Sequence, residues 1–164
     1  MKKIGLILLL IYSTCSFGQK REKIGIQVNG YLGVPVGLLS NDSNFNYGVS
    51  VGYLGKIENF FRVGGSIGYD HTVLNKASHI PQDRGFQYLF VGASAELDVY
   101  KKFYIAADLG YAFNQTKNGS GSHYFTPKVG YHYSDDFNFY LHYKGVRYSI
   151  GQVASIGAGL AYNF

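Results

Sequence analysis

The sequence predicts an all-β fold class: an eight-stranded antiparallel up-and-down transmembrane β-barrel, preceded by a cleaved signal peptide. Three observations predict it. From residue 23 onward, segments of about ten residues alternate between apolar and polar side chains, as strands with two different faces do. Aromatic side chains gather at both ends of the apolar rows, whereas Val, Ile, Leu and Ala fill the middle. The connections between the segments alternate between short and long.

The first residues have the features of a secretory signal peptide. Two lysines precede the apolar run 4–12, which is too short to span a bilayer, and the small residues that follow suit cleavage after Gly18. We therefore predict a signal peptide at 1–18 and a single barrel domain at 19–164. Cys15 is the only cysteine and lies inside this leader. A lipoprotein would carry its lipid on Cys15, but the residues around it fit that motif poorly.

Cleavage would leave a chain without thiols and with little net charge. Without Cys15, the mature chain has no thiol for catalysis, disulfides or cysteine metal sites. Loss of Lys2 and Lys3 reduces the 15 basic side chains to 13, against 10 acidic ones, for a net charge of +3. This charge is too small to predict a nucleic-acid partner, and no basic stripe accompanies it.

Four strands are predicted in the first part of the chain, at 24–31, 45–54, 60–70 and 86–99. Their apolar rows are Ile24, Ile26 and Val28; Tyr47, Val49, Val51 and Tyr53; Phe61, Val63, Gly65, Ile67 and Tyr69; and Leu89, Val91, Ala93, Ala95, Leu97 and Val99. The opposite rows hold mainly Gly, Ser and Asn, together with the charged side chains of these strands. A row that faces water would normally carry more Lys, Glu and Arg. We therefore predict that the apolar rows face lipid and that the Gly- and Ser-rich rows face the lumen.

Four further strands are predicted at 103–113, 124–134, 137–144 and 155–164. Their apolar rows are Phe103, Ile105, Ala107, Leu109, Tyr111 and Phe113; Phe125, Pro127, Val129, Tyr131 and Tyr133; Phe137, Phe139, Leu141 and Tyr143; and Ile156, Ala158, Leu160, Tyr162 and Phe164. Tilted strands of this length cross a bilayer, and a closed barrel leaves no sheet edge for lipid to satisfy. Pro127 cannot donate a ladder hydrogen bond, so we expect a bulge or a strand start there.

Aromatic side chains mark two membrane interfaces. Amphipathic tyrosine rings favour the headgroup zones, whereas aliphatic side chains favour the hydrocarbon. A soluble barrel or sandwich has no reason to sort its aromatic residues to both ends of the strands. The predicted interface residues are Tyr47, Tyr53, Phe61, Tyr69, Phe103, Tyr111, Tyr133, Phe137, Tyr143 and Tyr162.

The predicted connections also follow a membrane pattern. Short turns are expected at 55–59, 100–102 and 134–136. Longer polar stretches are expected at 33–44, 71–85 and 114–122, with a modest fourth connection near 145–152. Outer-membrane barrels combine short periplasmic turns with longer external loops, and an even strand number places both chain termini on the periplasmic side.

The terminal "GLAYNF", with apolar residues alternating back from a final Phe, resembles the C-terminal signature of outer-membrane β-barrels. With the signal peptide and eight strands, nearly the whole mature chain resembles small barrels of the OmpA-transmembrane-domain or OmpX type. The resemblance implies a place in the outer membrane of a Gram-negative bacterium, with its lipids and lipopolysaccharide as partners. It also implies that the barrel assembly machinery recognises Phe164 during insertion, and Phe164 can serve as an interface anchor as well.

The lumen of such a barrel is about wide enough for side chains and little else. Glycines in the polar rows should make room for the lumenal rings of Tyr31, Tyr88, Phe90, Tyr104 and Tyr140. Charges buried there must be paired. The predicted lumenal ion-pair network is Arg62 with Glu96 and Asp108 with Lys128, joined by Asp98, His132, His142 and Lys144. The pairs can act as a stabilising plug, or they can switch partners in a narrow gated pore.

These features predict a structural or adhesion-type role through the extracellular loops, with a narrow passive channel as the alternative. Two further alternatives fit less well. A lipid A-modifying enzyme of the deacylase type would offer Ser where Lys144 follows His142, and a lipocalin-like soluble carrier would need a Trp that the chain lacks. We therefore predict no enzyme activity.

No catalytic, cofactor or metal residues are predicted. The five histidines, at 71, 79, 123, 132 and 142, lack ligand spacing. Lys76, Arg84, Lys117 and Arg147 make the outer loops slightly basic, which can favour anionic lipopolysaccharide or host polyanions, or can serve ordinary loop solubility. The sequence does not identify an extracellular ligand.

Overall fold

The computed structural model describes residues 25–37, 40–75, 85–115, 121–148 and 151–164. The predicted signal peptide and Ile24 lie outside these residues, as do parts of the predicted long loops. Within the described part of the chain, no helix is both long and apolar enough to cross a membrane.

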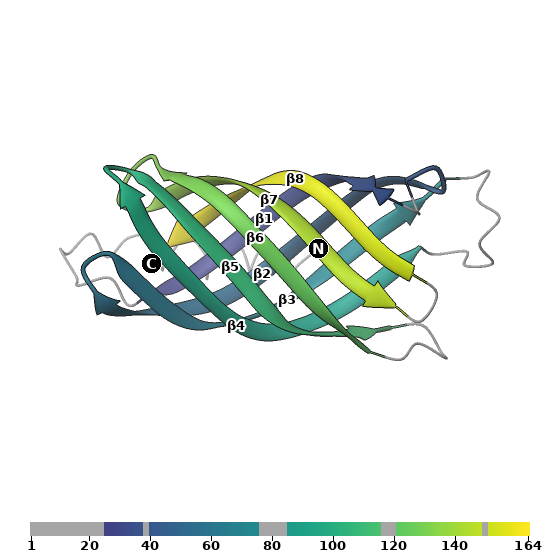
Figure 1. Ribbon diagram of the computed structural model, residues 1–164, viewed down its shortest axis with the longest axis horizontal. Helices are drawn as coiled ribbons and strands as arrows, with labels where there is room; N and C mark the ends of the chain where they lie inside the picture. The colour runs from purple at the N-terminus through teal and green to yellow at the C-terminus, as the bar shows by residue number, and fades with distance from the viewer. Residues whose placement is uncertain (1–24, 38–39, 76–84, 116–120, 149–150) are drawn as a thin grey trace, which may run out of the picture.

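Eight strands form one closed barrel in which every neighbouring pair is antiparallel, including β1 with β8 (Figure 1). The predicted all-β, up-and-down barrel is therefore confirmed. The strands are β1 (Ile26–Val36), β2 (Ser43–Glu58), β3 (Phe61–Leu74), β4 (Phe86–Tyr100), β5 (Phe103–Asn114), β6 (Ser122–His132), β7 (Phe137–Tyr148) and β8 (Gly151–Asn163). They cross the long axis of the barrel obliquely, as closure requires.

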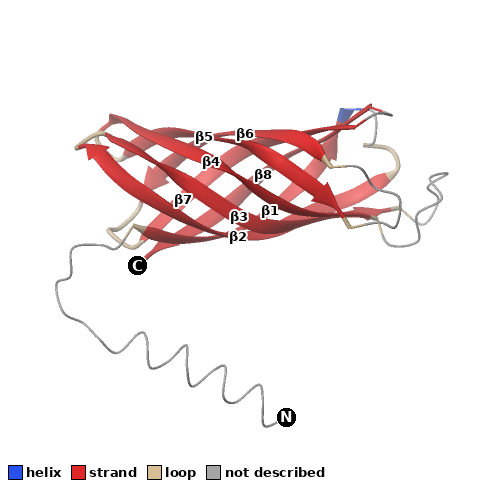
Figure 2. Ribbon diagram, turned by 90° about the horizontal axis from the view of Figure 1, so that it is seen from below, coloured by secondary structure: helices blue, strands red, loops and turns tan. Residues whose placement is uncertain are grey.

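The two ends of the barrel differ in their connections. At the turn end lie the short connections after β2, β4 and β6, together with the start of β1 and the C-terminal residue (Figure 2). There the Phe164 amide donates to the Ile26 carbonyl over 2.9 Å, which extends the β1–β8 ladder to the last residue. The loop end is the opposite end and carries the connections after β1, β3, β5 and β7.

The outer face is apolar and the lumen is polar, as predicted. On the outer face Leu109 is 57% exposed and Leu141 66%, whereas Asp70 and Lys144 in the lumen are 1% and 5% exposed. A soluble barrel has the opposite arrangement. An apolar surface that surrounds the whole barrel would be strongly unfavourable in water, so lipid is the medium that suits it.

Strand ends at the loop end differ from the prediction. β1 continues to Val36 and pairs with β8 along its whole length, so the predicted loop 33–44 is in part strand. The predicted connection near 145–152 is also wrong, because β7 and β8 pair as far as Tyr148 and Gly151. In both places ladder hydrogen bonds to a neighbouring strand outweigh the turn propensity of local Gly and Pro residues.

Pro127 lies within β6 and neither starts it nor forms a bulge, so that expectation is wrong. Its register against β5 runs through the Ala107–Pro127 pair without a shift. Towards β7, pairing passes from Phe125–Gly145 directly to Lys128–His142 at unchanged register. The missing proline N–H therefore interrupts one ladder locally.

Lumenal rings lie over glycines on the neighbouring strand, as expected. Tyr104 on β5 pairs with Gly130 on β6, and Tyr140 on β7 pairs with Gly159 on β8. A Cβ atom at either glycine would overlap the tyrosine ring. At these two positions the missing side chain of the facing glycine makes room for the tyrosine ring.

Gly130→Ala is expected to destabilise the barrel by about 1–3 kcal/mol, because the new methyl group overpacks the site of the Tyr104 ring. Gly30→Ala is the matched control, since a Cβ at Gly30 meets no atom within 4 Å. Urea unfolding of the two variants in lipid vesicles measures the difference. Equal midpoints for the two variants would contradict the packing argument.

Candidate functional site

The turn end of the lumen holds a cluster around Arg62. Its guanidinium forms an ion pair with Glu96 and a second with Asp98, where Nη2 lies 2.8 Å from Oδ2. His132 Nε2 lies 2.9 Å from Asp98 Oδ1, and His132 Nδ1 lies 2.8 Å from Asn138 Oδ1. Each ring nitrogen of His132 therefore faces an oxygen atom. The cluster joins β3, β4, β6 and β7 across the mouth of the barrel.

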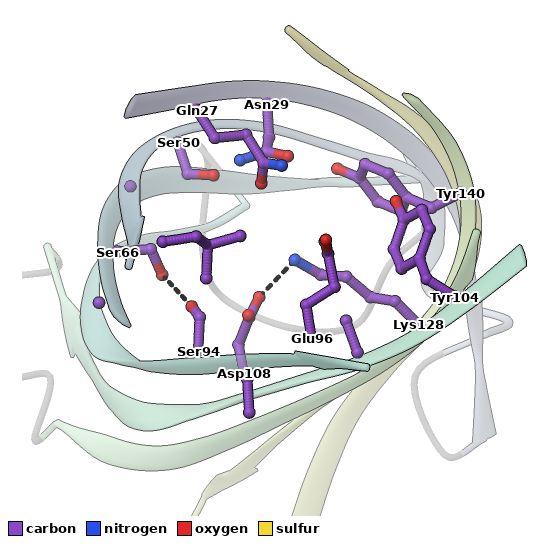
Figure 3. A pocket seen from close by; sticks show the side chains of 15 residues that line it. Gln27, Asn29, Ser50, Ser66, Ser94, Glu96, Tyr104, Asp108, Lys128 and Tyr140 are labelled. Atoms are coloured by element: carbon purple, nitrogen blue, oxygen red, sulfur yellow. Dashed lines mark hydrogen bonds and ion pairs between the residues drawn. The ribbon is translucent and has the colours of Figure 1, made fainter. Parts of the chain in front are cut away.

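A second ion pair joins the neighbouring strands β5 and β6 inside the lumen. Lys128 Nζ lies 2.6 Å from Asp108 Oδ2, and the Lys128 ammonium also lies 5.2 Å from the centre of the Tyr140 ring. Figure 3 shows the Lys128 side chain reaching through the lumen to Asp108. The Lys128 side chain is 14% exposed and that of Asp108 11%. This degree of burial means that each charge depends on the other.

A third cluster surrounds Asp70 on the loop-end side of the lumen. Lys144 Nζ lies 2.7 Å from Asp70 Oδ2, and the Tyr31 hydroxyl donates to the same oxygen over 2.6 Å. Asn46 donates to the other carboxylate oxygen over 2.7 Å. The Lys144 ammonium also lies 4.3 Å from the centre of the Phe90 ring, which is a cation–π contact. Asp70 is therefore a buried carboxylate with a cation and two neutral donors.

The structure brings most of the predicted network residues into ion pairs, with two differences. His142 is not in an ion pair: its buried ring nitrogens have no hydrogen-bond partner within the described chain, and its ring lies against Tyr31 and Tyr140. Asp70, which the prediction omitted, is the partner of Lys144. The predicted third strand ended at Asp70, which would have put this residue at the rim.

The lumen contains small cavities on both sides of the central ion pair. Each has a volume of about 20 Å³, and both are lined by Ser50, Asp108, Lys128 and Tyr140. A space of this size holds about one water molecule. A larger cavity of about 750 Å³ opens at the turn-end mouth, and Glu96 lines both this cavity and the nearer small one. Water can therefore enter the lumen from the turn end.

An apolar cluster closes the lumen towards the loop end. It consists of Phe86, Tyr88, Phe90, Ala112, Tyr124 and Val146, all buried, and we call it the apolar plug. Within the apolar plug, the rings of Phe90 and Tyr124 meet edge to face with centroids 5.2 Å apart. Sequence reasoning missed the plug as a unit because Val146 fell in a predicted loop. A tightly packed apolar layer of this kind excludes water and ions.

The comparisons with known proteins rest on structure alone, since no family model and no curated protein matches the chain. The attachment invasion locus protein Ail of Yersinia pestis is 15% identical, with a TM-score of 0.58 over 85% of this chain and 96% of that chain. Neisserial surface protein A is 16% identical, with a TM-score of 0.52 and the same coverage. A designed transmembrane β-barrel is 14% identical, with a TM-score of 0.55 over 89% of this chain and 100% of that chain.

The chain has the fold of small eight-stranded outer-membrane β-barrel proteins. Its identities to them are low, so the likeness concerns the fold and leaves loops and lumenal side chains to be argued from this chain alone.

The aromatic residues that were predicted for the membrane interfaces lie near both ends of the barrel. At the turn end Tyr53, Phe103 and Tyr133 are 55%, 49% and 64% exposed. Phe137 contacts Tyr162 with ring centroids 5.0 Å apart, and Phe61 stands beside Leu97. The other predicted interface residues, Tyr47, Tyr69, Tyr111 and Tyr143, lie in the loop-end halves of β2, β3, β5 and β7. Their place at a membrane interface stays a prediction.

One group of side chains in the described lumen has the composition of a metal site. Single ligand atoms of Glu96, Asp98 and His132 lie within 4.8 Å of one another. However, the Arg62 guanidinium pairs with both carboxylates and already supplies the cation. The arrangement is therefore explained by ion pairing, and we propose no metal there.

Proposed function

We propose that this protein is an integral outer-membrane β-barrel of a Gram-negative bacterium, with a lumen closed by side chains and a structural or adhesion-type role at the cell surface. The observation that carries the proposal is the combination of a closed barrel, an apolar outer face and a charged, paired lumen. The turn end would face the periplasm, and the connections at the loop end would meet extracellular partners. Outer-membrane lipids, including lipopolysaccharide, would surround the barrel.

Fractionation tests this proposal directly. The protein should require detergent for extraction and should migrate differently on SDS gels before and after boiling, because a folded barrel resists SDS. A chain that stays soluble in buffer without detergent would refute the membrane assignment. The mass of the purified chain would show whether the proposed signal peptide 1–18 is removed and 19–164 remains.

We propose no catalytic activity. The adjacent Asp70 and His71 point to opposite faces: Asp70 is buried in the lumen, and His71 Nδ1 lies 2.9 Å from the Tyr47 hydroxyl on the outer face. They therefore do not form an acid–histidine pair of the kind that activates a hydroxyl nucleophile.

A narrow passive pore is the second candidate, and the turn-end cavities favour it. Cavities lie between the turn-end mouth and the central ion pair, whereas the Asp70 cluster and the apolar plug fill the lumen between that pair and the loop end. We therefore expect the wild-type barrel to be silent in planar bilayers and the double variant Phe90→Ala/Tyr124→Ala to conduct, because the substitutions remove two rings of the plug. Phe113→Ala is the control, since Phe113 is on the outer face. A silent wild type would support the closed lumen of the first proposal, whereas conductance by the wild type would support the passive pore.

Phe164 is proposed to be both the signal read by the barrel assembly machinery and an interface anchor. Its ring packs edge to face on Tyr162, with centroids 4.7 Å apart, and remains 45% exposed. Phe164→Ala should lower the amount of folded barrel in cells several-fold while leaving refolding into lipid vesicles nearly unchanged. If Phe164→Ala lowers the folded amount in cells and the refolding yield in vesicles by the same factor, Phe164 acts only as an interface anchor and not as an assembly signal.

A further inference from the structure

A band of polar side chains ends the apolar surface at the loop end. Six outward positions near the ends of β3 to β8 carry them: His71, Gln87, Gln115, His123, Arg147 and Gln152. Two of these side chains contact tyrosines of the predicted membrane interface, which shows that they point outward. Tyr47 contacts His71, and Gln152 Nε2 donates to the Tyr143 hydroxyl over 2.9 Å. In the proposed outer-membrane orientation, this band would lie at the level where hydrocarbon gives way to lipid headgroups.

Part of the band forms a compact set of hydrogen-bond donors on β6, β7 and β8. Arg147 pairs with Gln152 across β7 and β8, and the Tyr124–Val146 pair sets a register that places His123 beside Arg147. We call His123, Tyr143, Arg147 and Gln152 the β6–β8 patch. The Tyr143 hydroxyl accepts from Gln152, so its own hydrogen remains available to donate. His123, Arg147 and Gln152 are exposed.

The sequence around the β6–β8 patch contains no acidic residue. Neither 109–134 nor 137–164 includes an Asp or Glu, although these two segments contain the loop-end parts of β5, β6, β7 and β8. By contrast, Asp42 lies just before β2 in the other half of the loop end. The positive charge of Arg147 therefore lies on strands whose own loop-end segments contain no carboxylate to compete for it.

We propose that the β6–β8 patch binds the phosphate of a phosphorylated glycolipid of the lipid A type. The proposal rests on the membrane assignment above, which places the loop end in the outer leaflet. A lipid phosphate lies just outside the hydrocarbon, at the level of this patch. The guanidinium of Arg147 can bind two phosphate oxygens at once, and His123, Tyr143 and Gln152 offer further donors. The apolar surface below the patch, including Leu141 and Ile156, would receive the acyl chains.

Native mass spectrometry of the detergent-solubilised, folded barrel tests the proposal, with diphosphoryl lipid A and dephosphorylated lipid A as probes. We expect the wild type to prefer the diphosphoryl form and Arg147→Gln to weaken its binding about tenfold, the scale of one charge-assisted bidentate contact. Arg147→Lys should be intermediate, because it keeps the charge and loses the planar fork. Lys101→Gln is the matched control: Lys101 is an exposed cation over the Tyr100 ring at the turn end, and its removal should change nothing.

Three outcomes would overturn the inference: equal binding by Arg147→Gln and the wild type, equal binding of the two lipid A forms, or complete displacement of lipid A by millimolar inorganic phosphate. The last would show a site for a free anion. All three leave the membrane assignment intact, because each is measured on a barrel that has already shown its heat-dependent mobility. Failure of that mobility test would defeat the membrane assignment itself.

Discussion

Leu109→Arg is expected to destabilise the barrel by about 2–4 kcal/mol or to abolish its assembly, because it places a charge on the lipid face near the bilayer midplane. Leu109 lies in the middle of β5, with its side chain 57% exposed on the outer face. Its neighbours across the ladders are Ala93 on β4 and Phe125 on β6, both apolar and outward. In hydrocarbon, an arginine there has no partner within reach.

Depth along the strand supplies the control. Val99 also faces outward, is 51% exposed and lies beside the β4–β5 turn, where the cost of an arginine should fall to about 0–1 kcal/mol. The chain contains no Trp, so the fraction folded is best followed by the mobility of unboiled samples on SDS gels during urea titration. If Leu109→Arg assembles as well as Val99→Arg, the outer face does not meet hydrocarbon.

The fold was predictable from the sequence because membrane strands carry a strict period of two. Val49 and Val51 on one parity, with Gly48 and Ser50 on the other, already distinguish a lipid face from a crowded lumen. The positions of strand ends were not predictable to the same degree. Val146 looks like a loop residue beside Gly145, yet it pairs with Val153 and fills the apolar plug. Its position depends on pairing with the neighbouring strand β8, and this pairing cannot be predicted from the residues next to Val146 in the sequence.

The same distinction separates the ion pairs that the sequence could predict from the one that it missed. Arg62 and Glu96 are paired residues on adjacent strands, so a register counted from the nearby turns brings them together. Asp70 on β3 and Lys144 on β7 meet across the lumen. The stagger of the strands in the closed barrel determines which residues face each other across the lumen. This stagger is a property of the whole barrel, and it cannot be predicted from each strand separately.

Lys144→Met is expected to cost about 3–5 kcal/mol, because it leaves the carboxylate of Asp70 buried without its cation. Asp70 is 1% exposed, so water cannot replace the ammonium group. Tyr31 and Asn46 would still donate to the carboxylate, but neutral donors do not compensate a full charge. The methionine side chain keeps most of the lysine's length, and its thioether can pack against the Phe90 ring. The loss therefore reports the unpaired charge rather than a cavity.

The double variant Lys144→Met/Asp70→Asn separates these two causes. Replacing both partners removes the uncompensated charge, and buried ion pairs can often be exchanged for uncharged groups at little net cost. Urea midpoints in lipid vesicles should therefore recover most of the way to the wild type, because an amide at residue 70 can still bond Tyr31 and Asn46. Lys102→Met, at an exposed turn-end lysine, should shift the midpoint little. If the single and double variants unfold at the same urea concentration, the cost lies in packing around Phe90, and the Asp70–Lys144 pair is not what holds this part of the lumen together.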